Sequence, residues 1–220
     1  LLGLIKKIKD NNSRLFNHKT LHIGDSHSIT FAHQHINLLS QSTKIQPALI
    51  LGGKAWHFAN KKNNRFKTSL KEQVQRHTDI NQIFISFGDI DCRENEGILY
   101  YSEKYKEDML VVAKKTVSKF VNYMELNLSL LSVKRFYFGF PAPMEEKESL
   151  SNLMLKRNKL VSSFNLFLKK EVLSRGCYFV DVYELTANKD GYNNCKYMCD
   201  STHLSHICLP ILIENHLYQP

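Results

Sequence analysis

The chain has 220 residues, of which 43% are hydrophobic and 23% charged, and this composition predicts one globular domain with its own hydrophobic core. No apolar run is long enough to cross a bilayer, which excludes a transmembrane helix. The net charge of +9 is densest over residues 61–67, which we interpret as a solvated loop and helix face, because no nucleic-acid recognition motif accompanies the charge. Nucleic acid is therefore not an expected partner, and an anionic polysaccharide or a phosphate-bearing carrier would also be attracted to such a surface.

The sequence begins with Leu1 rather than methionine. We interpret it as a piece of a longer chain, in which residues 1–18 form a linker or docking segment from an upstream domain. The alternative is an amphipathic turn that touches a membrane. Residues 19–220 are then the folded domain, because no repeat, low-complexity stretch or second linker divides them.

The remaining chain alternates short apolar runs with amphipathic stretches. The apolar runs predict strands at 20–23, 45–51, 80–87, 133–140 and 176–182. Helical spacing predicts helices at 28–39, 66–77, 103–131, 149–174 and from 204 onward, the third broken once and the last interrupted at Pro210. Strands that alternate with helices are typical of an α/β fold, a parallel sheet covered by helices on both faces.

Two short motifs carry the candidate chemistry. The first strand ends in a glycine turn that places Ser26 at a helix N-terminus, where free N–H groups favour developing negative charge. Far downstream, Asp200 precedes His203 by three residues, so its carboxylate can bind one ring nitrogen while the other takes a proton from a serine hydroxyl. We therefore predict a catalytic triad of Ser26, His203 and Asp200. His27 adjoins the nucleophile and either contacts the substrate or caps the helix.

These motifs resemble those of the SGNH hydrolases, also called the GDSL esterase/lipase superfamily. Gly24-Asp25-Ser26 is similar to the first sequence block of the family and Asp200-x-x-His203 to the last. Residues 85–93 read Ile-Ser-Phe-Gly-Asp-Ile-Asp-Cys-Arg and resemble a variant of the third block, Gly-x-Asn-Asp. The resemblance spans residues 19–213. It implies a three-layer α/β/α sandwich with a five-stranded parallel sheet in flavodoxin-like order, and no cofactor.

The resemblance also implies an oxyanion hole with three donors. The first is the N–H of Ser26, and the second is the N–H of either Gly52 or Gly53, which follow the second strand. The third donor in the family is an asparagine amide, and this chain has Asp91 there. An ionised carboxylate has no proton to donate.

Three interpretations of Asp91 follow. In the first, burial keeps Asp91 protonated, and its carboxyl O–H donates a hydrogen bond to the oxyanion. In the second, Asp91 pairs with Arg93, which then supplies the positive charge and contacts the substrate. In the third, the domain is inactive. We favour a structural role beside Arg93, because keeping a carboxyl neutral needs strong desolvation.

The five cysteines are odd in number and have no framework spacing. Cys195 and Cys199 would form half of a zinc site or a disulfide, but no second pair accompanies them. The sequence thus predicts no metal and a reduced, cytoplasmic setting.

The activity implied by the resemblance is removal of an O-acyl group, mainly acetyl, from a carbohydrate through an acyl-enzyme. One alternative is an O-acetyltransferase domain that modifies a surface polysaccharide, because the two motifs also resemble SGNH domains attached to such enzymes. The other is a carbohydrate-binding domain without catalysis. Asp91 favours that last alternative, whereas the intact serine and Asp-x-x-His argue against it.

Overall fold

The computed structural model describes residues 18–77, 79–129, 131–145 and 152–220. The predicted linker or docking segment lies outside the described residues except for His18, which begins the first strand.

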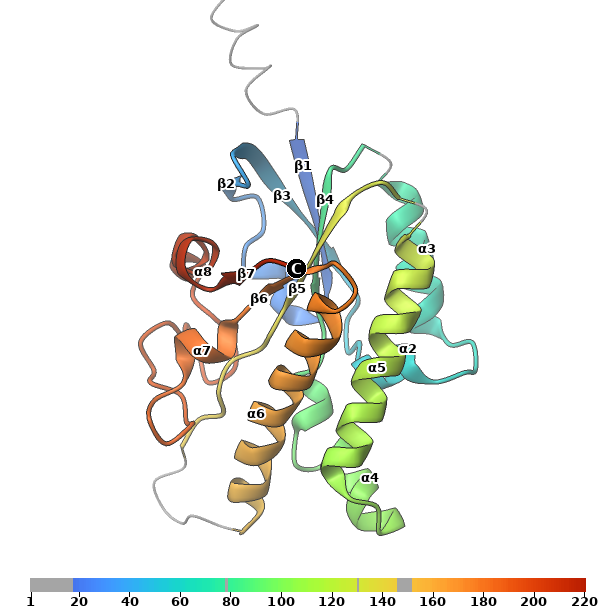
Figure 1. The fold of residues 1–220 in the computed structure, drawn as a ribbon, viewed down its shortest axis with the longest axis vertical. Helices are drawn as coiled ribbons and strands as arrows, with labels where there is room; N and C mark the ends of the chain where they lie inside the picture. The colour runs from blue at the N-terminus through green and yellow to red at the C-terminus, as the bar shows by residue number, and fades with distance from the viewer. Residues whose placement is uncertain (1–17, 78, 130, 146–151) are drawn as a thin grey trace, which may run out of the picture.

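The centre of the fold is a sheet with the order β2-β3-β1-β4-β5-β6-β7 (Figure 1). Its five inner strands pair in parallel: β1 (His18–Gly24), β3 (Gln41–Leu49), β4 (Gln82–Ser86), β5 (Lys134–Phe138) and β6 (Tyr178–Val180). In chain order these five lie as 2-1-3-4-5, the flavodoxin-like order. The predicted five-stranded parallel sheet is confirmed, and the structure adds an antiparallel strand at each edge.

The edge strand β2 (His35–Leu38) replaces the second half of the helix predicted over 28–39, and that prediction was wrong. Ile36 and Leu38 are buried between exposed neighbours, which is the two-residue period of a strand. Leu39 and Ser40 both have positive φ, 49° and 65°, and they form the tight turn that joins β2 to β3. Neither residue type favours positive φ, so the turn left no recognisable signal in the sequence.

The other edge strand, β7 (Leu217–Tyr218), pairs antiparallel with β6 near the C-terminus. It follows α8 (Leu209–Asn215), in which Pro210 stands in the first turn. Proline is tolerated there because the N–H that it lacks would have no partner within the helix. The predicted interruption is therefore a helix start.

The remaining helices are α2 (Ala55–Ala59), α3 (Arg65–Arg76), α4 (Ile98–Tyr105), α5 (Met109–Leu128), α6 (Asn152–Leu173) and α7 (Val182–Thr186), with short 3₁₀ turns η1 (Ser26–Ile29), η2 (Ile90–Cys92) and η3 (His206–Cys208). The helices predicted over 66–77, 103–131 and 149–174 are present among the described residues, although the second is two helices, the first of which begins at Ile98. The short helices over 55–59 and 182–186 were not predicted. The expected break within 103–131 lies at Lys106, whose φ of 57° ends α4. Asp108 then starts α5 by accepting the N–H groups of Leu110 and Val111.

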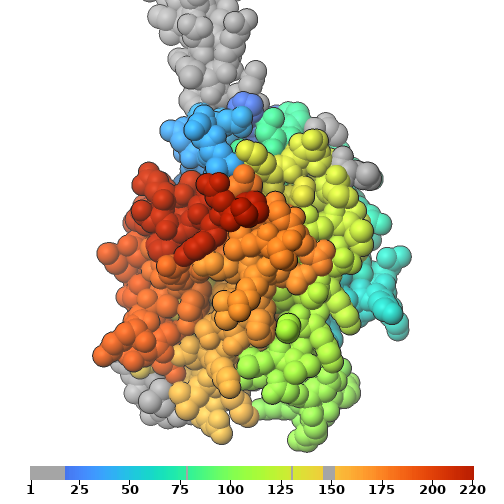
Figure 2. All heavy atoms as spheres, viewed as in Figure 1, coloured from blue at the N-terminus to red at the C-terminus, as the bar shows by residue number. Residues whose placement is uncertain are grey.

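The two faces of the sheet bury different cores. In β4, Ile83 and Ile85 pack under α2, α3, α5 and α6, whereas Phe84 faces the thinner layer that contains α7 and α8. The long helices α5 and α6 lie side by side in front of the sheet (Figures 1 and 2). On the other face, Leu209 and Leu212 of α8 join the core that includes Ile36 of β2. The sheet is thus covered on both sides, as predicted.

No helix among the described residues combines the length and apolarity that crossing a membrane requires. All five cysteines carry free thiols, and Cys195 and Cys199 are exposed, so the disulfide considered for that pair is not formed.

Candidate active site

Ser26 lies directly after β1, at the carboxyl edge of the parallel strands, where it begins η1. The turn requires glycine at position 24, because a Cβ there would lie 2.1 Å from Ser86 Oγ. Asp25 caps η1, since its Oδ1 accepts the N–H of His27 at 3.0 Å. These contacts fix the backbone around Ser26, whose side chain is half-buried.

The structure brings Ser26, His203 and Asp200 into one chain of hydrogen bonds. Ser26 Oγ lies 2.9 Å from His203 Nε2, although the two residues are 177 positions apart. On the other side of the ring, His203 Nδ1 lies 2.8 Å from Asp200 Oδ2. In the neutral tautomer that suits these contacts, Nδ1–H donates to the carboxylate and Nε2 accepts the serine hydroxyl proton.

Asp200 is oriented by the backbone of its own turn. Its Oδ1 accepts the N–H of Thr202 at 2.7 Å and the N–H of His203 at 2.6 Å. These bonds, first the one from the His203 backbone and then the one from its ring, lower the pKa of Asp200 to about 2. The carboxylate therefore stays ionised and holds the His203 ring in place.

Backbone hydrogen bonds distinguish the two glycines considered for the oxyanion hole. The N–H of Gly53 donates to the Ile50 carbonyl at 2.9 Å, and the N–H of Lys54 donates to His57 Nδ1 at 3.1 Å. Among the described residues, no acceptor faces the N–H of Gly52 or the N–H of Ser26. The Gly52 loop lies beside the Ser26 turn, because the N–H of Ile50 donates to the Gly24 carbonyl at 2.7 Å.

Asp91 is fully buried and holds the start of α2. Its Oδ2 accepts the N–H of Ala55 at 2.8 Å and its Oδ1 accepts the N–H of Trp56 at 2.9 Å. Burial raises the pKa of Asp91 to about 7, against the two N–H bonds, which lower it. The expected pair with Arg93 is absent, and that prediction was wrong: both carboxylate oxygens are engaged by backbone N–H groups.

The partner of Arg93 is instead Asp89, two residues before Asp91. Arg93 Nη2 donates to Asp89 Oδ2 at 3.1 Å, and His27 Nε2 forms an ion pair with the same oxygen at 3.8 Å. Burial opposes ionisation of Asp89, but His27 and Arg93 outweigh it and lower its pKa. Burial likewise opposes the charge on His27, and Asp89 and Asp25 outweigh it and raise the pKa of His27. The His27 ring lies 5.3 Å from the ring of His203, so this charged cluster borders the triad.

A hollow of about 220 Å³ opens between this cluster and the turn that carries His203. Its polar lining includes Asp89, Arg93, Arg157, Ser201 and Thr202. Among the described residues, Arg157 has no ion-pair partner. The hollow therefore presents two guanidinium groups beside the turn that carries His203.

Sequence reasoning missed Asp89 and Arg157. Asp89 lies inside the motif at 85–93, and its position directly after a buried strand could have identified it as a site residue. Arg157 lies on α6 in an ordinary amphipathic pattern, and nothing in the sequence distinguishes it from a surface arginine.

No family model and no curated protein sequence matches the chain. Solved structures do match it. The acetyl xylan esterase AlAXEase has a TM-score of 0.55 and 17% identity, over 89% of this chain and 96% of that chain. A GDSL-like lipase from Bacteroides thetaiotaomicron has a TM-score of 0.53 and 14% identity over 94% of both chains. An acetylxylan esterase from Geobacillus stearothermophilus has a TM-score of 0.54 and 14% identity, over 89% of this chain and 91% of that chain. The chain thus has the fold of these proteins, as the SGNH resemblance implied.

Proposed function

We propose that the chain is a serine ester hydrolase that removes a small acyl group, such as acetyl, from a carbohydrate. The observation that carries the proposal is the hydrogen-bonded chain from Ser26 through His203 to Asp200. A serine hydroxyl bonded to an imidazole that is itself oriented by a carboxylate is the arrangement that nucleophilic acyl transfer requires.

In the first half of the reaction, Ser26 Oγ forms a bond to the acyl carbon while its proton passes to His203 Nε2. The carbonyl electron pair moves onto oxygen, and the N–H groups of Ser26 and Gly52 donate to that oxyanion. When the tetrahedral intermediate collapses, the bond to the sugar oxygen breaks and His203 returns the proton to the leaving hydroxyl. Asp200 stabilises the imidazolium between these two steps.

In the second half, water attacks the acyl-enzyme and gives a proton to His203 Nε2. The second tetrahedral intermediate expels Ser26 Oγ, which regains this proton, and the free acid is released. All atoms and protons are then balanced, with one ester and one water converted to one alcohol and one acid. No step needs a metal or a cofactor.

The choice of a carbohydrate ester rests on two supports. The hollow beside His203 is polar, and its arginines and hydroxyl groups offer hydrogen bonds to a polyhydroxylated alcohol. Two of the structures with the same fold are acetyl xylan esterases. A polar hollow of this size favours a small acyl group on a sugar over a long-chain lipid ester.

Covalent labelling tests the proposal directly. We expect a fluorophosphonate to add once to the protein, at Ser26, and to abolish hydrolysis of p-nitrophenyl acetate in proportion to the labelled fraction. Peptide mass spectrometry and the residual rate are the two readouts. Labelling at another residue, or full activity after complete labelling of Ser26, would refute the mechanism. Release of acetate from an acetylated xylo-oligosaccharide tests the substrate class separately, and acetyl transfer to added sugar would identify the transferase alternative.

The oxyanion hole offers a second test, with a matched control in the next residue. Glycolic acid incorporated at position 52 replaces the N–H of Gly52 by an ester oxygen and leaves the side chain unchanged. We expect kcat for p-nitrophenyl acetate to fall by about 10²-fold, because one oxyanion donor is lost. The same replacement at Gly53 removes only the bond to Ile50, so the melting temperature should fall while kcat changes little. A larger loss of kcat at Gly53 than at Gly52 would reverse the assignment.

A further inference from the structure

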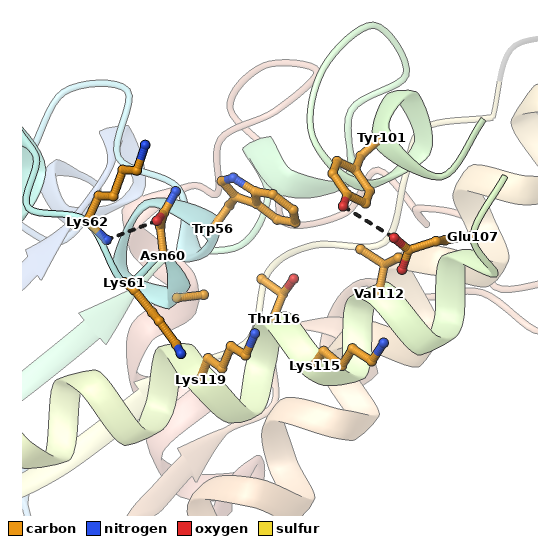
Figure 3. Close-up of a pocket in the computed structure, with 11 residues that line it drawn as sticks. Trp56, Asn60, Lys61, Lys62, Tyr101, Glu107, Val112, Lys115, Thr116 and Lys119 are labelled. Atoms are coloured by element: carbon orange, nitrogen blue, oxygen red, sulfur yellow. Dashed lines mark hydrogen bonds between the residues drawn. The ribbon is translucent and has the colours of Figure 1, made fainter. Parts of the chain in front are cut away.

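A second cavity, of about 480 Å³, lies between α2, α4 and α5 and shares no lining residue with the triad (Figure 3). Its volume falls within the usual range for small-molecule sites. We call it the Trp56 cavity, after the aromatic residue at its centre. The hydrolytic mechanism above makes no use of it.

The apolar part of the cavity is an aromatic pair together with Ala59 and Val112. The rings of Trp56 and Tyr101 lie 4.9 Å apart, tilted by 50°, and both side chains are half-buried. Among the described residues no acceptor faces the indole N–H of Trp56, and the hydroxyl of Thr116 opposite it is likewise unpartnered. The cavity thus offers one aromatic surface with a free donor at its edge and a hydroxyl below.

The polar part of the cavity is strongly basic. Lys61, Lys62, Lys115 and Lys119 line it, and within the described residues none of the four has an ion-pair partner. Lys115 and Lys119 project from α5 beneath the two rings, whereas Lys62 points away (Figure 3). The single acid of the lining, Glu107, accepts a hydrogen bond from the Tyr101 hydroxyl at 3.3 Å. A ligand in this cavity therefore meets uncompensated positive charge.

We propose that the Trp56 cavity binds a segment of an acidic, carboxylate-bearing polysaccharide. The C–H face of a sugar ring carries partial positive charge and packs on the negative face of an aromatic ring. Its hydroxyl groups match the indole N–H and Thr116, and its carboxylates match the ammonium groups of Lys61, Lys115 and Lys119. This binding is independent of Ser26 and goes beyond the proposed hydrolysis.

Single-stranded nucleic acid is the other class of polymer with aromatic and cationic partners. Its binding sites follow the backbone along a groove and offer successive bases separate stacking surfaces. Here the two rings contact each other, so they do not offer separate stacking surfaces to two successive bases. The geometry favours the acidic saccharide.

The chain provides its own reporter, because Trp56 is the only tryptophan in the sequence. We expect trigalacturonate to change the tryptophan fluorescence saturably, with weaker binding at higher salt. Lys115→Gln/Lys119→Gln should raise Kd by about tenfold or more, since two ammonium partners are lost. Hydrolysis of p-nitrophenyl acetate by this variant should be unchanged, and its melting temperature close to that of the wild type, because both lysines are exposed.

Lys114→Gln is the matched control, because Lys114 is exposed on the same helix but does not line the cavity. It should leave Kd nearly unchanged. The fully methyl-esterified trisaccharide should bind much more weakly than the acid. The proposal is overturned by the absence of a saturable signal, by equal effects of the control and the double variant, by equal binding of the methyl ester, or by tighter binding of oligouridylate.

Discussion

Ser26→Ala is expected to lower kcat for p-nitrophenyl acetate by roughly 10⁴-fold or more, as nucleophile removal does in other serine hydrolases. The hydroxyl that would attack the ester is lost, and His203 Nε2 has no proton to take from it. The melting temperature should stay within a few degrees of the wild type, because the side chain is small and half-buried. The paired measurements are initial rates at saturating ester and a thermal unfolding curve.

Ser28→Ala is the control for this prediction, because it removes a second hydroxyl from the same short 3₁₀ turn. Ser28 is buried and its Oγ donates to the Asp25 carbonyl at 2.8 Å, so its loss should affect stability more than rate. Substantial residual turnover in Ser26→Ala, or an equal loss of rate in both variants, would remove Ser26 from the mechanism.

The sheet could be predicted because its inner strands carry their own signal. Residues 80–87 are apolar throughout most of their length, since β4 is buried on both faces, and continuous apolar runs indicate parallel strands. The edge strands carry no such signal. β2 has four residues and β7 has two, and the turn at Leu39 and Ser40 uses residues that rarely adopt positive φ. Both edge strands form because they pair with a neighbouring strand of the sheet, and this pairing cannot be read from local sequence. The helical spacing over 28–39 was therefore misleading.

Contacts within the site also differ in how well the sequence predicts them, depending on whether they are local or distant along the chain. Asp200 and His203 could be paired from their spacing, because a single turn brings them together. Their contact with Ser26 depends on the whole sheet, and the sequence indicated it only because these three residue types form a triad. Asp89 and Asp91 show how far local sequence can predict the site. They are two positions apart, yet Asp89 faces His27 and Arg93, whereas Asp91 faces the start of α2. Which side each carboxylate faces is set by η2 and not by residue type.

The Asp91→Asn variant should reveal what this buried carboxyl does. One of its two acceptor oxygens becomes an NH₂ group that faces the N–H of Ala55 or Trp56. A buried N–H then loses its acceptor, at a cost of about 1–3 kcal/mol in unfolding free energy. For a domain of this size that corresponds to a fall in melting temperature of roughly 2–12 °C at pH 5. Activity should fall as well, because α2 follows directly on the Gly52 loop.

The pH dependence of this loss of stability distinguishes the possible roles of Asp91 more clearly than its size at one pH. The folded protein raises the pKa of Asp91 from its ordinary value near 4 to about 7, because the carboxyl is buried. Between those values the folded state keeps a proton that the unfolded chain has released, so stability falls as pH rises from about 4 to about 7. The Asp91→Asn substitution removes this dependence, because an amide does not titrate. The stability gap between wild type and variant should therefore narrow over that interval. Burial also raises the pKa of Asp25 to about 6, and the charge of Asp25 contributes to the raised pKa of Asp91, so this coupling is part of the expected change in the gap.

Asp89→Asn provides a control whose stability gap to the wild type changes in the opposite direction below about pH 4. The pKa of Asp89 is lowered by His27 and Arg93 against the effect of burial, so its stabilising ion pairs are present above pH 4 and lost as the carboxyl is protonated. Its stability gap to the wild type should widen as pH rises to about 4, and it should narrow again as pH rises through the raised pKa of His27, because the uncharged ring no longer forms an ion pair with Asp89. If Asp91 were instead the ionised partner of Arg93, Asp91→Asn would show that same widening. If Asp91 were a protonated oxyanion donor, Asp91→Asn would match or exceed the wild-type kcat and flatten the alkaline side of its pH profile. Urea unfolding between about pH 2 and 8 and kcat between pH 4 and 8 distinguish the three cases. A gap between wild type and Asp91→Asn that narrows between pH 4 and 7, together with a reduced kcat, identifies Asp91 as the acceptor that holds α2.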